Sequence, residues 1–397
     1  MSVSSQRAKQ VFVLPWPLEG LGGVNGVVQN LVREFAQSGP LSPVVIERAV
    51  GDAPSASEYA EVLRMILRSP YDPRHPLRAL VSFCIRAPWM LLKLRAFCRE
   101  QRVEVLNPHF VGLEHFCLVL LKRLGLFRGR VLLSFHGSDI RLMMQSGGLE
   151  RWFSLLTVRW ADYLIPCSEG LGSEVLMFAP ESAKRIVPIQ NGIDVDLFLR
   201  SSEAGFELPP PFSGRIRIVS IGAFEYKKGH NILLKAFSVL RHRNPLPALI
   251  IAGQTRSLFA ETQLLVHELE LQDDVLLYRD LPHDQAASLL RSCDVFVLSS
   301  RWEMGRYGEG FAMVLLEAAA AQKPVVSTLS CGVAEFIKDG ETGWVVPPED
   351  PAALAKAIQE ALDSPEEARR RAHNLHELVR RDFTWKRAHA RYVELTG

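Results

Sequence analysis

The chain has 397 residues, 48% of them hydrophobic, and a formal net charge of +2 at pH 7. This length predicts two or three domains, and so small a net charge argues against a nucleic-acid partner. Basic residues outnumber acidic ones over 1–200 and are outnumbered over 201–397, so we expect the first half to face any anionic surface.

The cysteines and the apolar runs argue against a metal-binding, disulfide-stabilised, secreted or membrane-spanning protein. The six cysteines are scattered without a C-x-x-C pair, which argues against a metal centre or a disulfide framework and favours free thiols. The N-terminal segment lacks the apolar core of a signal peptide, and the longest apolar runs, such as 116–121, are too short to span a membrane. We therefore expect a cytoplasmic protein.

Short β-branched runs alternate with helix-period stretches along the chain. In the first half, strands are predicted at 11–14, 43–46, 103–106, 131–135 and 163–168. A segment rich in Pro, Ser and Glu, 200–214, interrupts the pattern, which restarts with strands predicted at 216–222, 247–253, 275–278, 295–300 and 324–328. This alternation predicts two doubly wound α/β domains with parallel sheets, at 1–200 and 201–380.

Ligands of such sheets bind beyond the carboxyl ends of the strands. After the first strand, Gly22 and Gly23 precede a predicted helix at 24–38, so the backbone there can approach an anion. The alternative is a tight turn that only packs the helix. After the fourth strand comes His136, which can hydrogen-bond a polar ligand, although a lone histidine is more often structural.

The second domain opens with a basic turn. Lys227 and Lys228 follow the strand at 216–222 and precede a predicted helix. A lysine ammonium is a compact cation suited to a phosphate oxygen. The alternative is a solvated basic turn of no special role.

Two carboxylates stand eight positions apart in the run 308–328. Strong helix formers occupy 312–322, so we predict a helix that begins near Glu309–Phe311, with an N-terminus that favours a diphosphate. Glu309 lies at its mouth, and Glu317 lies about two turns further along. A carboxylate there can accept two hydrogen bonds from vicinal hydroxyls such as those of ribose. Alternatively, Glu309 only satisfies the helix dipole and Glu317 faces solvent.

In this order the motifs resemble those of the retaining glycosyltransferases of family 4, which have the GT-B fold. The resemblance covers nearly the whole chain, through GLGGV with Gly22 and Gly23, SFHGSD with His136, PCSEGL (166–171), IQNGIDVDLF (189–198), IGAF and KKG (221–229), EGFAMVLLEAAAAQKPVV (309–326) and GVAEFIKDGETGWVVPPED (332–350). The segment 383–395 resembles the helix that crosses back to the first domain, so we assign 381–397 to it.

The resemblance implies roles for single residues. Glu317 is expected to bind the ribose of a nucleotide-sugar, Glu309 the donor-sugar hydroxyls, and Lys228, assisted by Lys227, the diphosphate. His136 is expected to contact the transferred sugar. The amides of Gly22, Gly23, Gly310 and Phe311 are expected to serve the donor phosphates. His136, Lys228 and Glu309 are the predicted catalytic set.

Two departures from the family pattern stand out. Many members carry an arginine for the diphosphate where this chain has Ala223, and Lys227 or Arg306 is the predicted substitute. The segment 300–311 is longer than usual and brings Arg301, Glu303 and Tyr307 toward the site. The alternative is a surface insertion without function.

The resemblance implies transfer of a hexose with retained anomeric configuration, without metal ion or cofactor. The acceptor-binding first domain would take a glycan or lipid-linked acceptor in cell-envelope or exopolysaccharide synthesis. The segment 74–102 carries seven Lys or Arg and one acidic residue among apolar side chains, so we predict peripheral contact with the cytoplasmic face of the membrane. We expect Pro88 to divide it into two helices. The alternative is an ordinary helix with a solvated basic side.

Two rival functions remain open at this point. One is an epimerase or phosphorylase on the same scaffold. The other is a non-catalytic homologue, marked by Ala223 and the longer segment, that binds a nucleotide-sugar without turnover.

Overall fold

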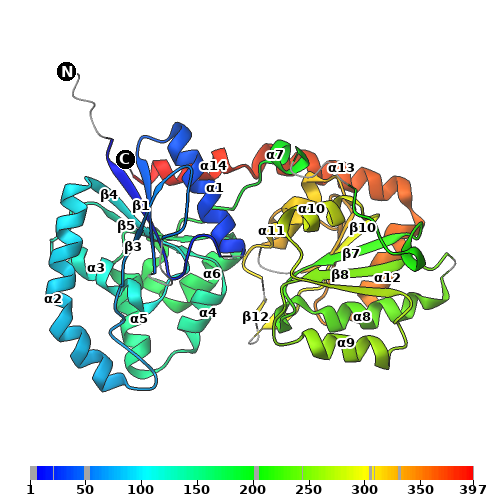
Figure 1. The fold of residues 1–397 in the computed structure, drawn as a ribbon, viewed down its shortest axis with the longest axis horizontal. Helices are drawn as coiled ribbons and strands as arrows, with labels where there is room; N and C mark the ends of the chain where they lie inside the picture. The colour runs from blue at the N-terminus through cyan, green and yellow to red at the C-terminus, as the bar shows by residue number, and fades with distance from the viewer. Residues whose placement is uncertain are drawn as a thin grey trace. The chain divides into compact units, whose positions relative to one another are not determined.

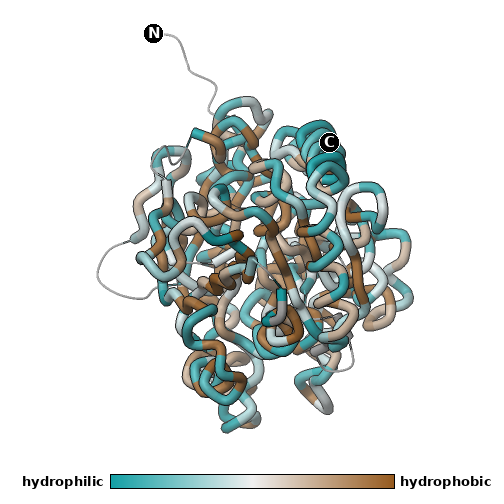
Figure 2. Tube along the Cα trace, turned by 90° about the vertical axis from the view of Figure 1, so that its right-hand side faces the viewer, coloured by the Kyte–Doolittle hydropathy of each residue, from teal (hydrophilic) through white to brown (hydrophobic). Residues whose placement is uncertain are grey.

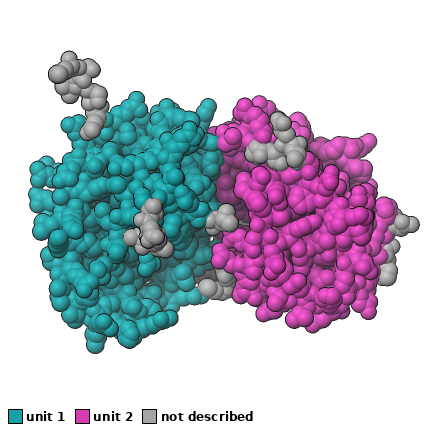
Figure 3. All heavy atoms as spheres, viewed as in Figure 1, with its two compact units in different colours: residues 1–191, 385–397 teal, residues 192–384 magenta. Residues whose placement is uncertain are grey.

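The computed structural model describes residues 7–396 apart from Leu21, 49–53, 201–204, Asn244, 304–305, Gly308 and 330–331. The chain forms two compact units (Figure 3): unit 1 is Met1–Asn191 with Trp385–Gly397, and unit 2 is Gly192–Thr384. Each unit contains a parallel sheet of six strands with helices packed on it (Figure 1). The predicted α/β class with two doubly wound domains is confirmed.

Unit 1 has the strand order β3-β2-β1-β4-β5-β6. Its strands are β1 (Lys9–Leu14), β2 (Ser42–Glu47), β3 (Glu61–Arg64), β4 (Val103–Pro108), β5 (Arg130–Phe135) and β6 (Tyr163–Pro166). Its helices are α1 (Gly23–Ser38), α2 (Pro76–Glu100), α3 (Phe116–Arg123), α4 (Ser138–Gln145), α5 (Gly148–Trp160), α6 (Glu169–Phe178) and α14 (Trp385–Glu394). The central strands are continuous apolar runs because helices cover both of their faces.

Unit 2 has the strand order β14-β13-β10-β7-β8-β9. Its strands are β7 (Arg217–Ile221), β8 (Ala248–Gly253), β9 (Val275–Arg279), β10 (Val295–Leu298), β13 (Val325–Thr328) and β14 (Trp344–Val346), with a small antiparallel pair of β11 (Trp302–Glu303) and β12 (Arg306–Tyr307). Its helices are α7 (Val195–Arg200), α8 (His230–Val239), α9 (Phe259–Glu268), α10 (His283–Arg291), α11 (Met313–Ala320), α12 (Pro351–Asp363) and α13 (Pro365–Asp382).

Each sheet has one point where the strand order reverses. In unit 1 the chain runs outward from β1 to β3 and then returns to the other side of β1 as β4. In unit 2 the same reversal lies between β7 and β10. Ligands of open α/β sheets bind in the crevice at the carboxyl ends of these two neighbouring strands.

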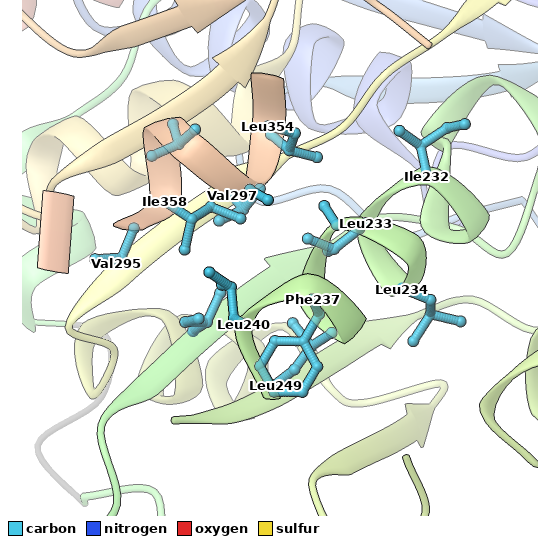
Figure 4. Packing of buried hydrophobic residues seen from close by; sticks show 14 of the residues in the cluster. Ile232, Leu233, Leu234, Phe237, Leu240, Leu249, Val295, Val297, Leu354 and Ile358 are labelled. Atoms are coloured by element: carbon cyan, nitrogen blue, oxygen red, sulfur yellow. The ribbon is translucent and has the colours of Figure 1, made fainter. Parts of the chain in front are cut away.

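Apolar side chains fill the space between sheet and helices. In unit 2 Leu249 and Val297 of the sheet pack against Leu233 and Phe237 of α8 and Ile358 of α12 (Figure 4). Hydrophobic segments run through the interior in the tube view and hydrophilic ones gather at the outside (Figure 2). Burial of these side chains is the main stabilising contribution to each unit.

The structure places both predicted domain boundaries at other residues. Unit 1 ends at Asn191 rather than at residue 200, because α7 packs against α11 of unit 2. Unit 2 continues to Thr384, because α13 extends to Asp382, and only α14 belongs to unit 1. There α14 packs on α1, with the His389 ring 4.4 Å from that of Phe35.

The prediction that Pro88 divides the segment 74–102 into two helices is wrong. The structure has one helix, α2, with Pro88 inside it. Proline removes one N–H donor, which leaves the carbonyl of Cys84 without its helical partner. Both residues lie on the exposed side of α2, where water can bind that carbonyl.

Candidate active site

Two of the predicted catalytic residues meet at the reversal point of unit 2. Lys228 ends the single turn that follows β7, and Glu309 follows β10 and its small antiparallel pair. Lys228 Nζ lies 2.6 Å from Glu309 Oε1, and the two side chains are only 15% and 10% exposed. The structure therefore joins them as a buried ion pair where a ligand of this sheet is expected.

Backbone contacts fix the lysine turn. Gly229 has a positive φ of 64°, and a Cβ there would lie 2.0 Å from the carbonyl oxygen of Ser299, so only glycine fits. The Ser299 hydroxyl donates to the carbonyls of Lys228 (3.1 Å) and Gly229 (3.0 Å). The stem of Lys228 packs over Gly222, where a Cβ would approach its Cδ to 3.0 Å. The ammonium position is thus set by its surroundings.

The helix after Glu309 begins later than predicted. It starts at Met313, with Ala312 as its N-cap, so Glu309–Phe311 precede α11 and are not part of it. The ring of Phe311 packs against Phe336, at a centroid distance of 5.5 Å, and against Phe383. Because the ring is used in packing, the backbone N–H is the group of Phe311 that is best suited to contact a ligand.

Glu317 lies on α11 and faces α10. Its Oε1 is 3.4 Å from Nε2 of His283, whose side chain is 73% exposed. The hydrogen bond to Glu317 raises the pKa of His283, with further support from the charges of Glu317 and Asp284, while desolvation acts in the opposite direction. The predicted ribose carboxylate is thus held by a titratable partner.

The lysine turn has a further cationic neighbour. The Arg301 N–H donates to the carbonyl of Lys227 (3.0 Å), and the guanidinium lies 3.8 Å from the ring centroid of Tyr226. Its Nε also pairs with Glu349 at 3.2 Å, while Lys227 pairs with Glu225. The side chains of Glu303, Arg306 and Tyr307 lie outside the described part of the structure.

In unit 1 the predicted glycines begin α1, directly after β1. A Cβ added at Gly22 or Gly23 would meet no heavy atom within 4 Å in the described part of the chain. Gly22 has φ 156°, which favours glycine. Asn25 holds the preceding loop, since its amide donates to the carbonyls of Leu18 (2.9 Å) and Gly20 (2.6 Å).

Glu47 also holds this loop, and sequence reasoning missed it. The carboxylate is fully buried at the end of β2 and accepts hydrogen bonds from the N–H of Leu18 (2.8 Å) and the hydroxyl of Ser55 (2.6 Å), while Arg64 pairs with it at 3.2 Å. Burial alone would raise the pKa of Glu47, but these hydrogen bonds hold it below its usual value. A glutamate at a strand end gives no sequence signal of this role.

His136 follows β5, and Asp139 fixes its backbone. The Asp139 carboxylate accepts hydrogen bonds from the N–H groups of His136 (3.1 Å), Gly137 (2.8 Å) and Val111 (3.1 Å). Burial raises the pKa of Asp139 to about 6, although the backbone bonds act in the opposite direction. These bonds close a turn after β5 and fix the backbone of His136 at the end of the strand.

A second histidine, which sequence reasoning missed, sets the state of His136. His109 follows β4 at the reversal point of unit 1, and its Nδ1 lies 3.1 Å from Nε2 of His136. Its Nε2 lies 3.2 Å from Oδ1 of Asn107. The Asn107 amide donates to the carbonyl of Leu132 and the hydroxyl of Ser134, both at 2.9 Å, so its Oδ1 is an acceptor.

The donor and acceptor of each hydrogen bond in the series Asn107–His109–His136 can therefore be assigned. His109 gives its Nε2–H to Asn107 and accepts at Nδ1, which leaves His136 as the donor at Nε2. Burial lowers the pKa of His109 well below its usual value and that of His136 to about 4, so both rings are neutral near pH 7. His136 is then left with Nδ1 as an acceptor for a ligand hydroxyl.

Two neighbouring cavities open at the edge of unit 1 where β1 and β2 end. They measure about 170 and 340 Å³ and share Pro15, Arg48 and Glu114 in their walls. The larger one is also lined by Trp16, Phe110 and Asp139. Its volume falls within the usual range for small-ligand sites, and aromatic walls with a few polar groups suit a sugar or another amphipathic ligand.

Metal ligation and membrane spanning were examined over the described ranges. No group of three or more His, Cys, Asp or Glu there could hold a metal ion, and the independence from metal ions and cofactors stays a prediction. None of the helices in these ranges is long and apolar enough to cross a bilayer.

Comparison with known proteins gives the following matches. The chain is 28% identical to glycogen synthase of Mycobacterium tuberculosis, over 95% of this chain and 92% of that protein. It is 29% identical to a GDP-mannose-dependent phosphatidylinositol monomannoside mannosyltransferase of Mycolicibacterium smegmatis, over 55% of this chain and 57% of that one. The Anabaena protein HepE, solved in complex with UDP, superposes with a TM-score of 0.72 at 16% identity, over 97% of this chain and 99% of HepE.

Two family models match consecutive parts of the chain. Residues 21–197 match Glycosyltransferase Family 4, and residues 206–377 match Glycosyl transferases group 1. Together the models span most of both units, and the fold agrees with that of the solved neighbour. The chain therefore belongs to the glycosyltransferases of family 4 and has their GT-B fold.

Proposed function

We propose that this glycosyltransferase moves a hexose from a nucleoside diphosphate sugar to a glycan or lipid-linked acceptor and retains the anomeric configuration. The observation that carries the proposal is the buried Lys228–Glu309 pair at the reversal point of unit 2. A lysine held over Gly222 cannot move far, so its charge is already in place when the leaving diphosphate develops negative charge.

The rest of the donor site follows from neighbouring groups. The backbone N–H groups of Gly310 and Phe311, just before α11, and those of its first turn suit the diphosphate, and Glu317 suits the ribose hydroxyls. Lys227 and Arg301 lie beside Lys228 but pair with Glu225 and Glu349, so in this proposal the charge for the diphosphate comes mainly from Lys228. The HepE complex with UDP, a protein of similar fold, supports a nucleoside diphosphate as the ligand.

The reaction exchanges one bond at the anomeric carbon. The bond from this carbon to the diphosphate oxygen breaks, and the acceptor oxygen forms a bond on the same face. The acceptor proton passes to the leaving phosphate oxygen, so no protein nucleophile is needed. Glu309 and His136 Nδ1 accept hydrogen bonds from hydroxyls of the transferred sugar. The backbone N–H groups of Gly22 and Gly23 donate to the phosphates of the nucleoside diphosphate.

The acceptor is assigned to unit 1. The cavity lined by Trp16 and Phe110 provides stacking surfaces for a sugar ring, and Arg48, Glu114 and Asp139 provide polar contacts. The phosphatidylinositol mannoside acceptor of the Mycolicibacterium relative supports a lipid-linked glycan. Synthesis of an envelope or extracellular polysaccharide at the cytoplasmic side of the membrane is the role that fits this chemistry.

The test is the release of sugar from a panel of nucleoside diphosphate sugars, followed by NMR. With water or a simple alcohol as acceptor, we expect one donor to be consumed and the first product to carry the anomeric configuration of the donor. The Lys228→Ala variant should release far less. An inverted product contradicts the retaining mechanism. Binding without any release, also with membrane extracts as acceptor, favours the non-catalytic alternative.

Nucleotide affinity should depend on pH through His283. Below its raised pKa the protonated ring holds Glu317, and ribose hydroxyls must displace it, so affinity should rise as pH increases from 6 to 8. Because the pair is exposed, we expect a change of about two- to fivefold. Calorimetry with an intact nucleotide-sugar measures it, since its diphosphate, unlike the terminal phosphate of a free diphosphate, does not titrate near pH 6.

The matched variant for this prediction is His283→Asn. It should bind at pH 6 as tightly as at pH 8. If nucleotide affinity in His283→Asn depended on pH as it does in the unmodified protein, the Glu317–His283 pair would not compete with the ligand.

A further inference from the structure

We propose that the outer face of α2 docks unit 1 on an anionic lipid surface. The helix is buried on one side by Phe83, Ala87, Leu91, Leu94 and Cys98. Its other side carries a second apolar row, the α2 stripe, with exposed fractions of 76% for Leu77, 59% for Val81, 73% for Ile85, 50% for Trp89 and 60% for Leu92.

The α2 stripe is a feature of the helical spacing. At 100° per residue its five side chains fall within one third of the circumference, centred about 140° from the buried row. It extends over four turns, about 22 Å along the axis. An amphipathic helix of a globular protein normally needs one apolar face, toward its core. On the exposed side of α2 the apolar stripe shares its arc with Arg78, Arg95 and Arg99, so this side combines apolar and basic side chains.

Charge identifies the partner. The helix and its two flanks carry Arg74, Arg78, Arg86, Lys93, Arg95, Arg99 and Arg102, all exposed, against the single acidic residue Glu100. Arg86 and Lys93 border the α2 stripe, and Lys93 Nζ lies 4.1 Å from the ring centroid of Trp89. Basic side chains beside exposed aliphatic and indole groups match a bilayer surface, where anionic headgroups lie above acyl chains.

The geometry fits a helix that lies flat on the surface. In Figure 1 α2 runs along the outside of unit 1, and its buried row joins it to α3 and β4. The stripe can therefore enter the headgroup region without unfolding any part of the unit. The inference is independent of the donor and acceptor proposed above, because lipid binding needs no turnover.

Vesicle binding of the full chain tests the proposal. We expect binding to vesicles of equimolar phosphatidylcholine and phosphatidylglycerol, weaker at high salt, and at least tenfold weaker binding to phosphatidylcholine alone. Ile85→Ser with Trp89→Ser should reduce the partition coefficient about 100-fold, because two exposed apolar side chains are lost. Arg86→Glu with Lys93→Glu should reduce it more than tenfold.

Matched controls lie in unit 2. Leu264→Ser removes an apolar side chain that is 62% exposed on α9, and Lys235→Glu with Lys356→Glu reverses two exposed charges. Leu264→Ser should leave vesicle binding unchanged, and the double lysine variant should reduce it only as far as the lower net charge of the whole chain requires. An environment-sensitive label at exposed Cys84, in a Cys331→Ser background, should shift to shorter wavelength only with anionic vesicles, since Cys98, Cys117, Cys167 and Cys293 are buried.

Three results would overturn the proposal. The first is that the unmodified chain fails to bind anionic vesicles at low salt. The second is that Ile85→Ser with Trp89→Ser binds as well as the unmodified chain. The third is that this variant converts a dimer into a monomer in solution, which would make the α2 stripe an interface between copies.

Discussion

We expect Lys228→Ala to lower kcat/KM by about 1000-fold. In the proposed mechanism this side chain supplies the fixed charge that stabilises the leaving diphosphate. Among the described side chains of its turn, Lys227 pairs with Glu225 and Arg301 pairs with Glu349, so neither is placed to substitute for it. The same change leaves Glu309 buried without its 2.6 Å partner, so the free energy of unfolding should fall by about 3 kcal/mol. Steady-state kinetics and denaturant unfolding measure the two effects.

Lys227→Ala is the control for this prediction. It removes a neighbouring lysine of the same turn that pairs with the partly exposed carboxylate of Glu225, so it should cost less than tenfold in kcat/KM. Lys228→Ala combined with Glu309→Gln should recover stability without recovering activity. Equal losses in Lys227→Ala and Lys228→Ala would contradict the special role of Lys228.

We expect His136→Ala to lower kcat by about 100-fold with little change in KM for the donor. In the proposed mechanism the ring accepts a hydrogen bond from a hydroxyl of the transferred sugar, and that bond strengthens as charge develops in the transition state. Because burial lowers the pKa of His136 to about 4, the kcat profile should show no step near pH 6.5 from this group. A full rate in His136→Ala would remove it from the catalytic set.

His109 should act through His136 as a positioning residue. His109→Phe keeps the buried ring but removes the acceptor 3.1 Å from His136 Nε2, so kcat should fall about tenfold. Nitrogen NMR of the His136 ring should show the proton on Nε2 in the unmodified protein and a mixture of tautomers in His109→Phe. An unchanged tautomer would limit His109 to packing.

Sequence patterns predicted ten of the twelve strands in the two six-stranded sheets, the two-domain division and the family. Continuous apolar runs mark strands that are buried on both faces, so they can be recognised without tertiary information. The edge strands β3 and β14 were missed, because β3 is a short run, EVLR, without a buried residue, and β14 has only three residues. The boundary between the two units was placed after residue 200 instead of after Asn191, because the packing of α7 on α11 involves residues far apart in sequence.

The candidate site was predicted only in part for the same reason. Lys228, Glu309 and His136 follow strands and Glu317 lies on the helix after Glu309, all in recognisable motifs, and their assigned roles stay predictions. Glu47, Asn107 and His109 gained their significance from partners that only folding brings near, such as Ser55 for Glu47. A buried polar residue is satisfied by distant neighbours, and a single sequence does not reveal those pairings.

The measurement that tests the central claim most directly is thermal stabilisation by a panel of nucleoside diphosphates and their sugars. A ligand at about 100 times its Kd should raise Tm by about 5 °C or more in the unmodified chain. The shift should disappear in Glu317→Ala and persist in Glu360→Ala, which removes an exposed carboxylate of α12. Absence of any shift in the folded protein at millimolar concentrations would contradict the donor site in unit 2.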